Sequence, residues 1–259
     1  MQRFLPFPAS TSGRVRTALA AFALLGLGAC STAQPGVEFS DPYEAQNRKV
    51  HDFNVAFDKA LFSKSDDTEK KSGIPAPVLR TVSNFGGNLG LPGKVLNSVL
   101  QGRPEPAVKN TFRFLVNSTL GLGGIFDPAS SSFGLPETDT DFGETLHVWG
   151  ASEGAYLELP ILGPSTERDA AGKVVDHLID PLGFILPRPE STYVTGAKIA
   201  SKVSDRLRFG DTVDSILHES ADSYAQTRLL YLQNRRFELG METTTDADAY
   251  DPYEDPYGP

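Results

Sequence analysis

Cys30 is the only cysteine in the 259-residue chain, and it limits what can hold the fold together. It follows an apolar run, residues 18–29, which is long enough for the core of an export signal and too short to cross a bilayer. Arg3, Arg14 and Arg16 supply the positive charge that begins such a signal. With one thiol, no disulfide can form within the chain, so non-covalent packing must hold the fold even in an oxidising compartment.

The residues before Cys30 indicate that it is a site of lipid attachment. Leu27-Gly28-Ala29-Cys30 resembles the bacterial lipobox, in which small residues precede a cysteine that receives a diacylglyceryl group. Acyl chains contribute about 0.8 kcal/mol per buried methylene, so two or three chains make a durable anchor. The alternative is an ordinary secretory signal with an incidental cysteine. We therefore predict a signal peptide over residues 1–29, a lipidated tether over 30–40, and a protein anchored in the outer membrane and facing the periplasm. In enterobacteria-like sorting, Asp after the lipidated cysteine favours the inner membrane, so resemblance to such lipoproteins makes Ser31 favour the outer membrane.

The C-terminal residues 241–259 differ in composition from the rest. From residue 242 onward they carry six acidic residues and no basic one, with Asp-Pro-Tyr repeated at 251–253 and 255–257. Such a stretch buries too little apolar surface to offset its ordering entropy, which predicts a disordered tail. Binding of a partner through the repeated tyrosines is the alternative.

Charge and hydropathy exclude several classes of protein. The net charge is −9 although the only charged residues of the predicted signal are basic. No dense basic stripe occurs elsewhere, and both observations argue against a nucleic-acid partner. It also argues against broad electrostatic adhesion to anionic headgroups. No run of about 18 apolar residues follows the signal, so the sequence predicts no conventional transmembrane helix.

The periodicity predicts a mainly α fold, one helical domain over residues 41–240 with little β structure. Asp41 is the expected N-cap of the first helix, with Pro42 at N1 and Glu44 at the capping-box position. An apolar stripe is expected on this helix, made of Tyr43, Val50, Phe53, Phe57 and Ala60.

Further elements follow from punctuation by glycine and proline. Residues 74–82 and 84–100 read as separate segments, because Gly86, Gly87, Gly90 and Pro92 interrupt the second. The other expected helices span residues 104–120, 172–185, 191–208 and 212–239. Residues 121–135 are expected to be irregular, and residues 156–159 form the best candidate strand.

Motifs for catalysis or metal binding are missing from the sequence. His51, His147, His177 and His218 are far apart, form no metalloprotease motif and are expected at the surface or at helix caps. No Gly-x-Ser-x-Gly elbow, dinucleotide fingerprint or P-loop occurs, and the acids at 139, 141 and 144 lack full calcium-loop spacing. We therefore predict neither an enzyme nor a bound cofactor or metal.

The segment from Phe112 to Phe126 has the composition of a partial membrane insertion. It is apolar, broken by Asn117-Ser118-Thr119, and followed by a glycine-rich bend. At about 15 residues it is too short for a full crossing, but a helix, a bend and a return would reach part way into a leaflet. A buried hairpin in an ordinary core is the alternative.

Motifs along nearly the whole mature chain carry a family resemblance. The first are Asp41-Pro42-x-Glu44-x-x-Asn47-Arg48 with Phe53-Asn54 and Asp58, Asn84-Phe85-x-x-Asn88-Leu89-x-x-Pro92, Asn97, Leu100-Gln101-Gly102 and Arg113-Phe114-x-x-Asn117-Ser118-Thr119-x-Gly121-x-x-Gly124-x-x-Asp127. They continue with Asp141-Phe142-Gly143-x-Thr145-Leu146, Trp149-Gly150, Leu159-Pro160-x-x-Gly163-Pro164-Ser165-x-x-Arg168-Asp169 and Ser220-x-Asp222-x-Tyr224-x-x-x-Arg228-x-x-Tyr231-x-Gln233-x-Arg235. In this order they resemble the VacJ/MlaA family of outer-membrane lipoproteins. The chain departs from the family at Ala155, where proline is common, and at His147, where glycine is common.

The resemblance implies a compact ring-like bundle of short helices, partly embedded in the outer membrane, with an amphipathic channel. It implies removal of phospholipid from the outer leaflet and its delivery to a periplasmic carrier, which maintains lipid asymmetry, and a possible neighbour in a trimeric porin. The alternatives are an envelope-structural or adhesion lipoprotein without transport, and a lipid hydrolase with an unfamiliar site.

Candidate site residues follow from this reading. The lipid-path or membrane-contact candidates are Phe85, Leu89, Leu120, Leu122, Ile125 and Phe126, with core packing as the alternative for each. Arg113, Arg168 and Arg228 are headgroup candidates, with capping or ion pairing as the alternative. Asn84 and Asn88 are expected to brace the glycine-rich turn rather than to touch lipid.

Overall fold

The computed structural model describes residues 41–62 and 74–241, which form a mainly helical fold with one small hairpin. The signal, the tether with Cys30, and the acidic tail from residue 242 onward lie outside the described residues. In chain order the elements are α2 (Glu44–Phe62), α3 (Ala76–Leu100), α4 (Pro104–Thr119), α5 (Pro128–Ser131), α6 (Phe142–Val148), β1 (Tyr156–Leu159), β2 (Gly163–Thr166), α7 (Glu167–Leu178), α8 (Pro181–Ile185), α9 (Glu190–Arg208), α10 (Gly210–Leu217) and α11 (Ser223–Glu238).

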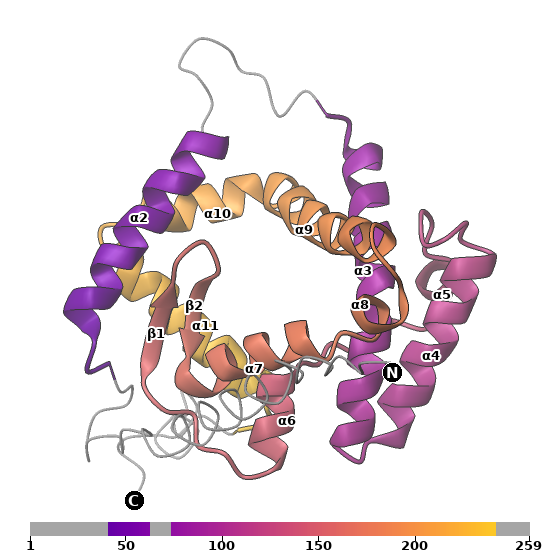
Figure 1. The fold of residues 1–259 in the computed structure, drawn as a ribbon. Helices are drawn as coiled ribbons and strands as arrows, with labels where there is room; N and C mark the ends of the chain where they lie inside the picture. Colours follow the sequence, from indigo (N-terminus) through magenta and orange to yellow (C-terminus); the bar gives the residue numbers. More distant parts are fainter. Residues whose placement is uncertain (1–40, 63–73, 242–259) are drawn as a thin grey trace, which may run out of the picture.

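The helices are arranged as a ring (Figure 1). The helices α2, α10, α9 and α3 follow one another around it, and α6 and α7 lie on the side opposite α9 and α10. Helix α4 packs along the outer side of α3, with α5 beside it. The mainly α fold with little β structure is as predicted.

The hairpin joins α2 to the rest of the ring. Strand β1, predicted at these residues, pairs antiparallel with β2, Tyr156 opposite Thr166. Asn47 of α2 donates to the Tyr156 carbonyl oxygen at 3.0 Å and accepts from the Glu158 amide at 3.0 Å. Asn54, two turns later, accepts from the Ile161 amide at 2.7 Å. Amide side chains therefore dock this helix, because a hairpin edge offers backbone donors and acceptors that apolar groups would leave unpaired.

Helix α2 corrects two predictions from the sequence. It begins at Glu44, and the Asp41 carboxylate accepts from Asn47, Tyr224 and Arg228 instead of capping the helix. The predicted apolar stripe is also wrong as a core face. Tyr43, Phe53 and Phe57 are exposed, and the buried residues of the helix are Asn47 and His51. The helix thus turns its polar side inward, toward the hairpin. His51, expected at the surface or at a helix cap, lies inside the helix and is only 2% exposed.

Helix α3 is continuous where the sequence predicted two segments. Its 25 residues include Gly86, Gly87, Gly90 and Pro92. Local propensity against the helix is overridden by packing, because α4 lies along one side of α3 and α9 along another.

Two other predicted helices are each divided in the structure. Helix α7 begins at Glu167, where Thr166 Oγ1 accepts from the Asp169 amide at 3.2 Å, and a new helix, α8, starts at Pro181. The predicted helix 212–239 is broken between α10 and α11, where the Asp222 carboxylate accepts from the Ala225 amide at 3.0 Å and caps α11. Side-chain caps from Thr166 and Asp222 fix the starts of α7 and α11 more firmly than the apolar spacing does, and Pro181 marks the start of α8.

Burial in the described residues is inverted relative to an ordinary globular core. Eleven apolar residues are buried, against twenty polar or charged ones, while thirty-two large apolar side chains are exposed. The apolar cluster consists of Tyr156, Tyr224 and Leu232, with Tyr231 packed against it. Within residues 41–62 and 74–241, no helix combines the length and hydropathy that crossing a membrane requires. An exposed apolar surface of this extent indicates a non-aqueous environment or a partner, since monomeric soluble proteins rarely keep one.

Candidate functional site

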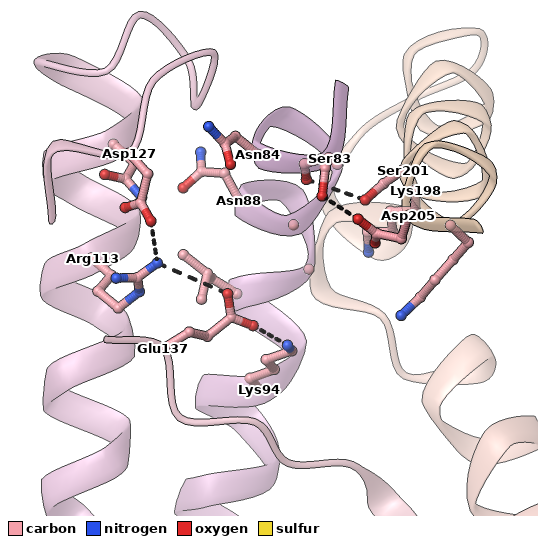
Figure 2. Close-up of a pocket in the computed structure, with 16 residues that line it drawn as sticks. Ser83, Asn84, Asn88, Lys94, Arg113, Asp127, Glu137, Lys198, Ser201 and Asp205 are labelled. Atoms are coloured by element: carbon pink, nitrogen blue, oxygen red, sulfur yellow. Dashed lines mark hydrogen bonds and ion pairs between the residues drawn. The ribbon is translucent and has the colours of Figure 1, made fainter. Parts of the chain in front are cut away.

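A polar cavity of about 300 Å³ lies over one face of α3, between α4 and α9 (Figure 2). Its floor is the stretch of α3 from Ser83 to Lys94, and its walls are Arg113 and Asn117 of α4 and Lys198 to Asp205 of α9. The loop residues Asp127 and Glu137 complete it. The lining carries four cationic side chains and three carboxylates, so the cavity is strongly polar while remaining close to charge balance.

Glycines give the floor its shape. A β-carbon on Gly86 would lie 2.4 Å from Ser201 Cβ, so this glycine lets α9 approach α3. Gly87 and Gly90 differ, because a β-carbon on either would meet no atom within 4 Å. These two positions face open space, so at them the surface of α3 beneath the cavity is bare backbone.

Arg113 organises the wall formed by α4. It donates to Ser130 Oγ at 2.7 Å, to the Leu135 carbonyl oxygen, and to Asp127 Oδ2 at 3.1 Å. Burial would raise the pKa of Asp127, but hydrogen bonds from Ser130, Asn117 and Arg113 hold it below its ordinary value. The arginine is only 3% exposed and links α4 to the loop that follows it.

Lys94 connects the floor to the same loop. Its ammonium is bonded to Glu137 and lies 2.6 Å from Asp139 Oδ1. Burial would lower the pKa of Lys94, but attraction to Asp139 and Glu137 outweighs it and raises the pKa above its ordinary value. Lys94 therefore stays charged at neutral pH.

The opposite wall belongs to α9. Ser83 Oγ donates to Asp205 Oδ1 at 2.6 Å, and Ser201 Oγ donates to the Ser83 carbonyl oxygen at 3.1 Å (Figure 2). Lys198 pairs with Asp180 at 2.8 Å. Lys202 also lines the cavity, and among the described residues no carboxylate lies within ion-pair distance of it.

The glycine-rich turn after α4 is braced by the two predicted asparagines. Asn88 donates to Ser118 Oγ at 3.1 Å and to the Gly123 carbonyl oxygen at 3.2 Å, and Asn84 donates to the Ile125 carbonyl oxygen at 3.4 Å. Gly124 has φ +100°, and a β-carbon there would lie 2.5 Å from Asn88 Cβ, so only glycine fits. The turn is thereby fixed against α3, as predicted for these asparagines.

The predicted membrane-contact residues gather around this turn and on the neighbouring face of α3. Leu120, Leu122 and Phe126 are each more than half exposed, Phe85 and Ile125 are exposed to a lesser degree, and Leu89 is half-buried. Leu122 has φ +52°, a strained conformation for a leucine, which the bracing of the turn sustains. None of the five exposed residues packs as a core residue would.

The predicted headgroup arginines are engaged by carboxylates of the chain itself, the alternative that the sequence left open. Arg113 is paired as described, Arg168 pairs with Asp169 at 3.2 Å, and Arg228 pairs with Asp41. Of the three, Arg113 alone lines the polar cavity.

Asp169 is the centre of a second polar cluster, outside the cavity. Arg235 Nη2 lies 3.1 Å from it and 2.7 Å from Asp141, and Tyr231 donates to it at 2.7 Å. Burial would raise the pKa of Asp169, but the charge of Arg235 and the other donors hold it below its ordinary value. This cluster ties α11 to α6 and α7. Close to it lies His147, whose pKa is lowered by burial and by Arg168.

Metal-ligating side chains converge at one place in the described part of the chain, where atoms of Asp58, Asp214 and His218 lie within 4.8 Å of one another. Arg206 already occupies this group, with Nη2 2.6 Å from both carboxylates. The acids at 139, 141 and 144 do not converge, because each pairs with a different cation: Lys94, Arg235 and Arg103 respectively.

The sequence did not single out most of the cavity lining. Lys94, Lys198, Lys202 and Glu137 carry no local motif and meet only through the packing of α3, α4 and α9. The glycines of α3 were visible, but as helix breakers. Gly87 and Gly90 lie in a helix although no neighbouring atom packs against them, and such glycines are the signal that could have marked the cavity.

Comparison with known proteins identifies a family. The family model described as MlaA lipoprotein matches residues 39–238. The Escherichia coli and Shigella flexneri proteins named intermembrane phospholipid transport system lipoprotein MlaA are each 32% identical over 222 residues, covering 85% of this chain and 86% of theirs. An uncharacterised Rickettsia conorii protein is 34% identical over 193 residues, covering 74% of this chain and 75% of its own.

A solved structure shares the fold. It is described as the structural basis for maintenance of bacterial outer membrane lipid asymmetry, and it superposes with a TM-score of 0.63 at 28% identity. The match covers 77% of this chain and 99% of the solved one.

Proposed function

The chain belongs to the MlaA lipoprotein family, and on that premise we propose that it transports phospholipid between membranes and maintains the lipid asymmetry of the outer membrane. It takes phospholipid from the outer leaflet, passes it through an amphipathic channel, and delivers it to a periplasmic carrier. Lipid attached to Cys30 anchors it in the outer membrane, facing the periplasm, and a trimeric porin is its neighbour there.

The inverted burial is the observation that carries this proposal. Among the described residues twenty polar or charged residues are buried, whereas thirty-two large apolar side chains are exposed. Apolar area in water costs about 25 cal/mol per Å², and hydrocarbon removes that cost. The lipid-facing part is the set Phe85, Leu89, Leu120, Leu122, Ile125 and Phe126 around the glycine-rich turn.

The same arrangement suits a molecule with two kinds of surface. A phospholipid headgroup loses its hydration in hydrocarbon at high cost, and a polar passage restores hydrogen-bonding partners while the acyl tails stay in apolar surroundings. No covalent bond changes in this process, so it requires no nucleophile, and the sequence offers no catalytic motif.

A strain lacking the gene tests the proposal. We expect it to accumulate phospholipid in the outer leaflet, measured by labelling with a membrane-impermeant reagent, and we expect the full-length gene to restore the wild-type level. The Cys30→Ala form should restore it poorly, because anchoring is lost. An unchanged outer leaflet in the deletion strain would refute transport.

Two further arms separate the alternatives. Deletion of residues 242–259 should leave transport intact, whereas an adhesin acting through its tyrosine-rich tail would lose function. Incubation of the purified protein with labelled phospholipid should release no hydrolysis product, and a product would favour a lipid hydrolase instead.

A further inference from the structure

We propose that the cavity over α3 binds the headgroup of a zwitterionic phospholipid, with Lys202 as the contact for its phosphate. This inference rests on the proposed function and adds a place and a headgroup class to it. Three independent observations support it: the open glycine floor, unpaired buried polar atoms in the lining, and the distribution of ion pairs.

The first observation is the cost of the floor. Glycine in a helix is less favourable than alanine because it loses more backbone entropy on folding. Gly86 has a packing reason, but a β-carbon on Gly87 or Gly90 would meet nothing within 4 Å. Both have helical backbone, so neither is needed for an unusual φ. What they do is keep the surface of α3 clear beneath the cavity, which leaves room for a guest.

The second observation concerns Asn88 and Arg113, which are each only 3% exposed. Asn88 Oδ1 and Arg113 Nε are buried without a hydrogen-bond partner, and both side chains line this cavity. Buried polar atoms are nearly always paired, so an unpaired acceptor and an unpaired donor in one lining indicate a polar guest. A zwitterionic headgroup brings both kinds of group.

The third observation is the pairing of the charges. Arg113, Lys94 and Lys198 are held by carboxylates of the chain. Lys202, on the exposed side of α9, has only a longer-range attraction to Asp139 among the described residues. Its ammonium is the lining cation left to meet a phosphate. Asp127, Glu137 and Asp205 also line the cavity, so a headgroup that carries an ammonium group beside its phosphate meets both signs of charge there.

The size of the cavity is consistent with a headgroup alone. At about 300 Å³ it is at the lower end of ligand pockets. The acyl tails would lie outside it, over the exposed apolar residues of α3 and the glycine-rich turn.

Binding to the purified full-length lipoprotein in detergent tests the proposal, with short-chain phosphatidylethanolamine and phosphatidylglycerol as probes. We expect phosphatidylethanolamine to bind the more tightly. Lys202→Gln should weaken its binding by about tenfold, the effect of losing a hydrogen bond to a charged group, and Lys202→Glu should weaken it further. Equal binding of both lipids, or wild-type affinity in Lys202→Glu, would overturn the proposal.

The glycines supply a matched pair for transport. Gly87→Leu fills the cavity and should fail to clear outer-leaflet phospholipid, while Gly93→Leu, on the same helix and also facing open space but outside the lining, should behave as wild type. Gly87→Ala guards against misfolding, because it should fold normally and bind with an intermediate affinity.

The outcomes separate the two claims. If the wild-type gene does not clear the outer leaflet, the proposed function fails. If the wild-type gene removes phospholipid from the outer leaflet and Gly87→Leu and Lys202→Glu remove it equally well, only the headgroup site is wrong. The unpaired atoms are then hydrogen-bonded to water.

Discussion

Gly86 of α3 and Ser201 of α9 approach so closely that a β-carbon on Gly86 would lie 2.4 Å from Ser201 Cβ and 2.6 Å from the Ala197 carbonyl oxygen. The contact sets the spacing between α3, the floor of the cavity, and the wall that α9 forms, and it makes the glycines of α3 unequal.

Substitution of neighbouring glycines by alanine should therefore have opposite effects. We expect Gly86→Ala to destabilise the fold by about 1–3 kcal/mol, because overpacking pushes α9 away. Gly87→Ala should stabilise it by about 0.5–1 kcal/mol through helix propensity alone. Thermal or denaturant unfolding in detergent measures both, and equal stabilities would contradict the close packing of α3 on α9.

Asn47 should be essential for docking α2 on the hairpin. Asn47→Ala leaves the Tyr156 carbonyl and the Glu158 amide without their buried partner, which should cost about 1–3 kcal/mol for each group left unsatisfied. Asn234→Ala is the control, because Asn234 is exposed and bonds only to Glu238, one turn along the same helix. A loss of stability no greater than that of the control would show that α2 is held by other contacts.

The cluster around Asp169 predicts acid sensitivity. Because the pKa of Asp169 is depressed in the folded state, the stabilisation that its carboxylate provides is present at neutral pH. That stabilisation should begin to fall as the pH drops below the unfolded value of about 3.9, and it should vanish once the pH passes the folded pKa.

Asp169→Asn tests this dependence. It should lower stability at pH 6 by about 3–5 kcal/mol, because Arg235 and Arg168 lose a buried partner. The variant should also show a flatter decline between pH 5 and pH 2 than the wild type does. If the melting temperatures of the two proteins fall in parallel across this pH range, the depressed pKa of Asp169 is not the source of the acid sensitivity.

Arg113 should not tolerate lysine. The planar guanidinium reaches Asp127, Ser130 and the Leu135 carbonyl together, which one ammonium cannot do. We expect Arg113→Lys to cost about 1–3 kcal/mol. Arg103→Lys should cost less than that, because Arg103 is half-exposed and makes a single ion pair, to the buried carboxylate of Glu144, which one ammonium can also make.

The exposed turn should contribute to membrane retention. Leu122 and Phe126 are 65% and 57% exposed, so replacing both with serine should leave folding unchanged. In a Cys30→Ala background, which removes the proposed lipid anchor, the double variant should float less with phospholipid vesicles than its parent does. Glu105→Ser, at an exposed position of α4, is the control. If the parent, the double variant and the control float equally well, the turn does not contact the membrane.

The sequence predicted elements whose signals are local. The helix at Pro104–Thr119 was found because a proline marks its start, and the strand at Tyr156–Leu159 because Gly154 and Pro160 bound a short, mostly apolar stretch. The continuity of α3 was missed because its glycines and Pro92 predict a break, whereas packing by α4 and α9, which no local pattern shows, keeps the helix continuous.

The burial of α2 was read the wrong way for a different reason. A stripe of aromatic residues predicts a core face only if the surroundings are water, and here the polar edge contains the buried residues Asn47 and His51. The cavity was hidden for a third reason, since its charges are contributed by segments about a hundred residues apart. No local pattern records such a meeting.

The inverted burial also affects how the folded chain behaves in water. A fold whose interior contacts are made by amides, guanidinium groups and carboxylates gains little free energy from collapse in water. Its exposed apolar side chains favour self-association there. We expect the chain to keep the described arrangement only where lipid, detergent or a partner covers that exterior.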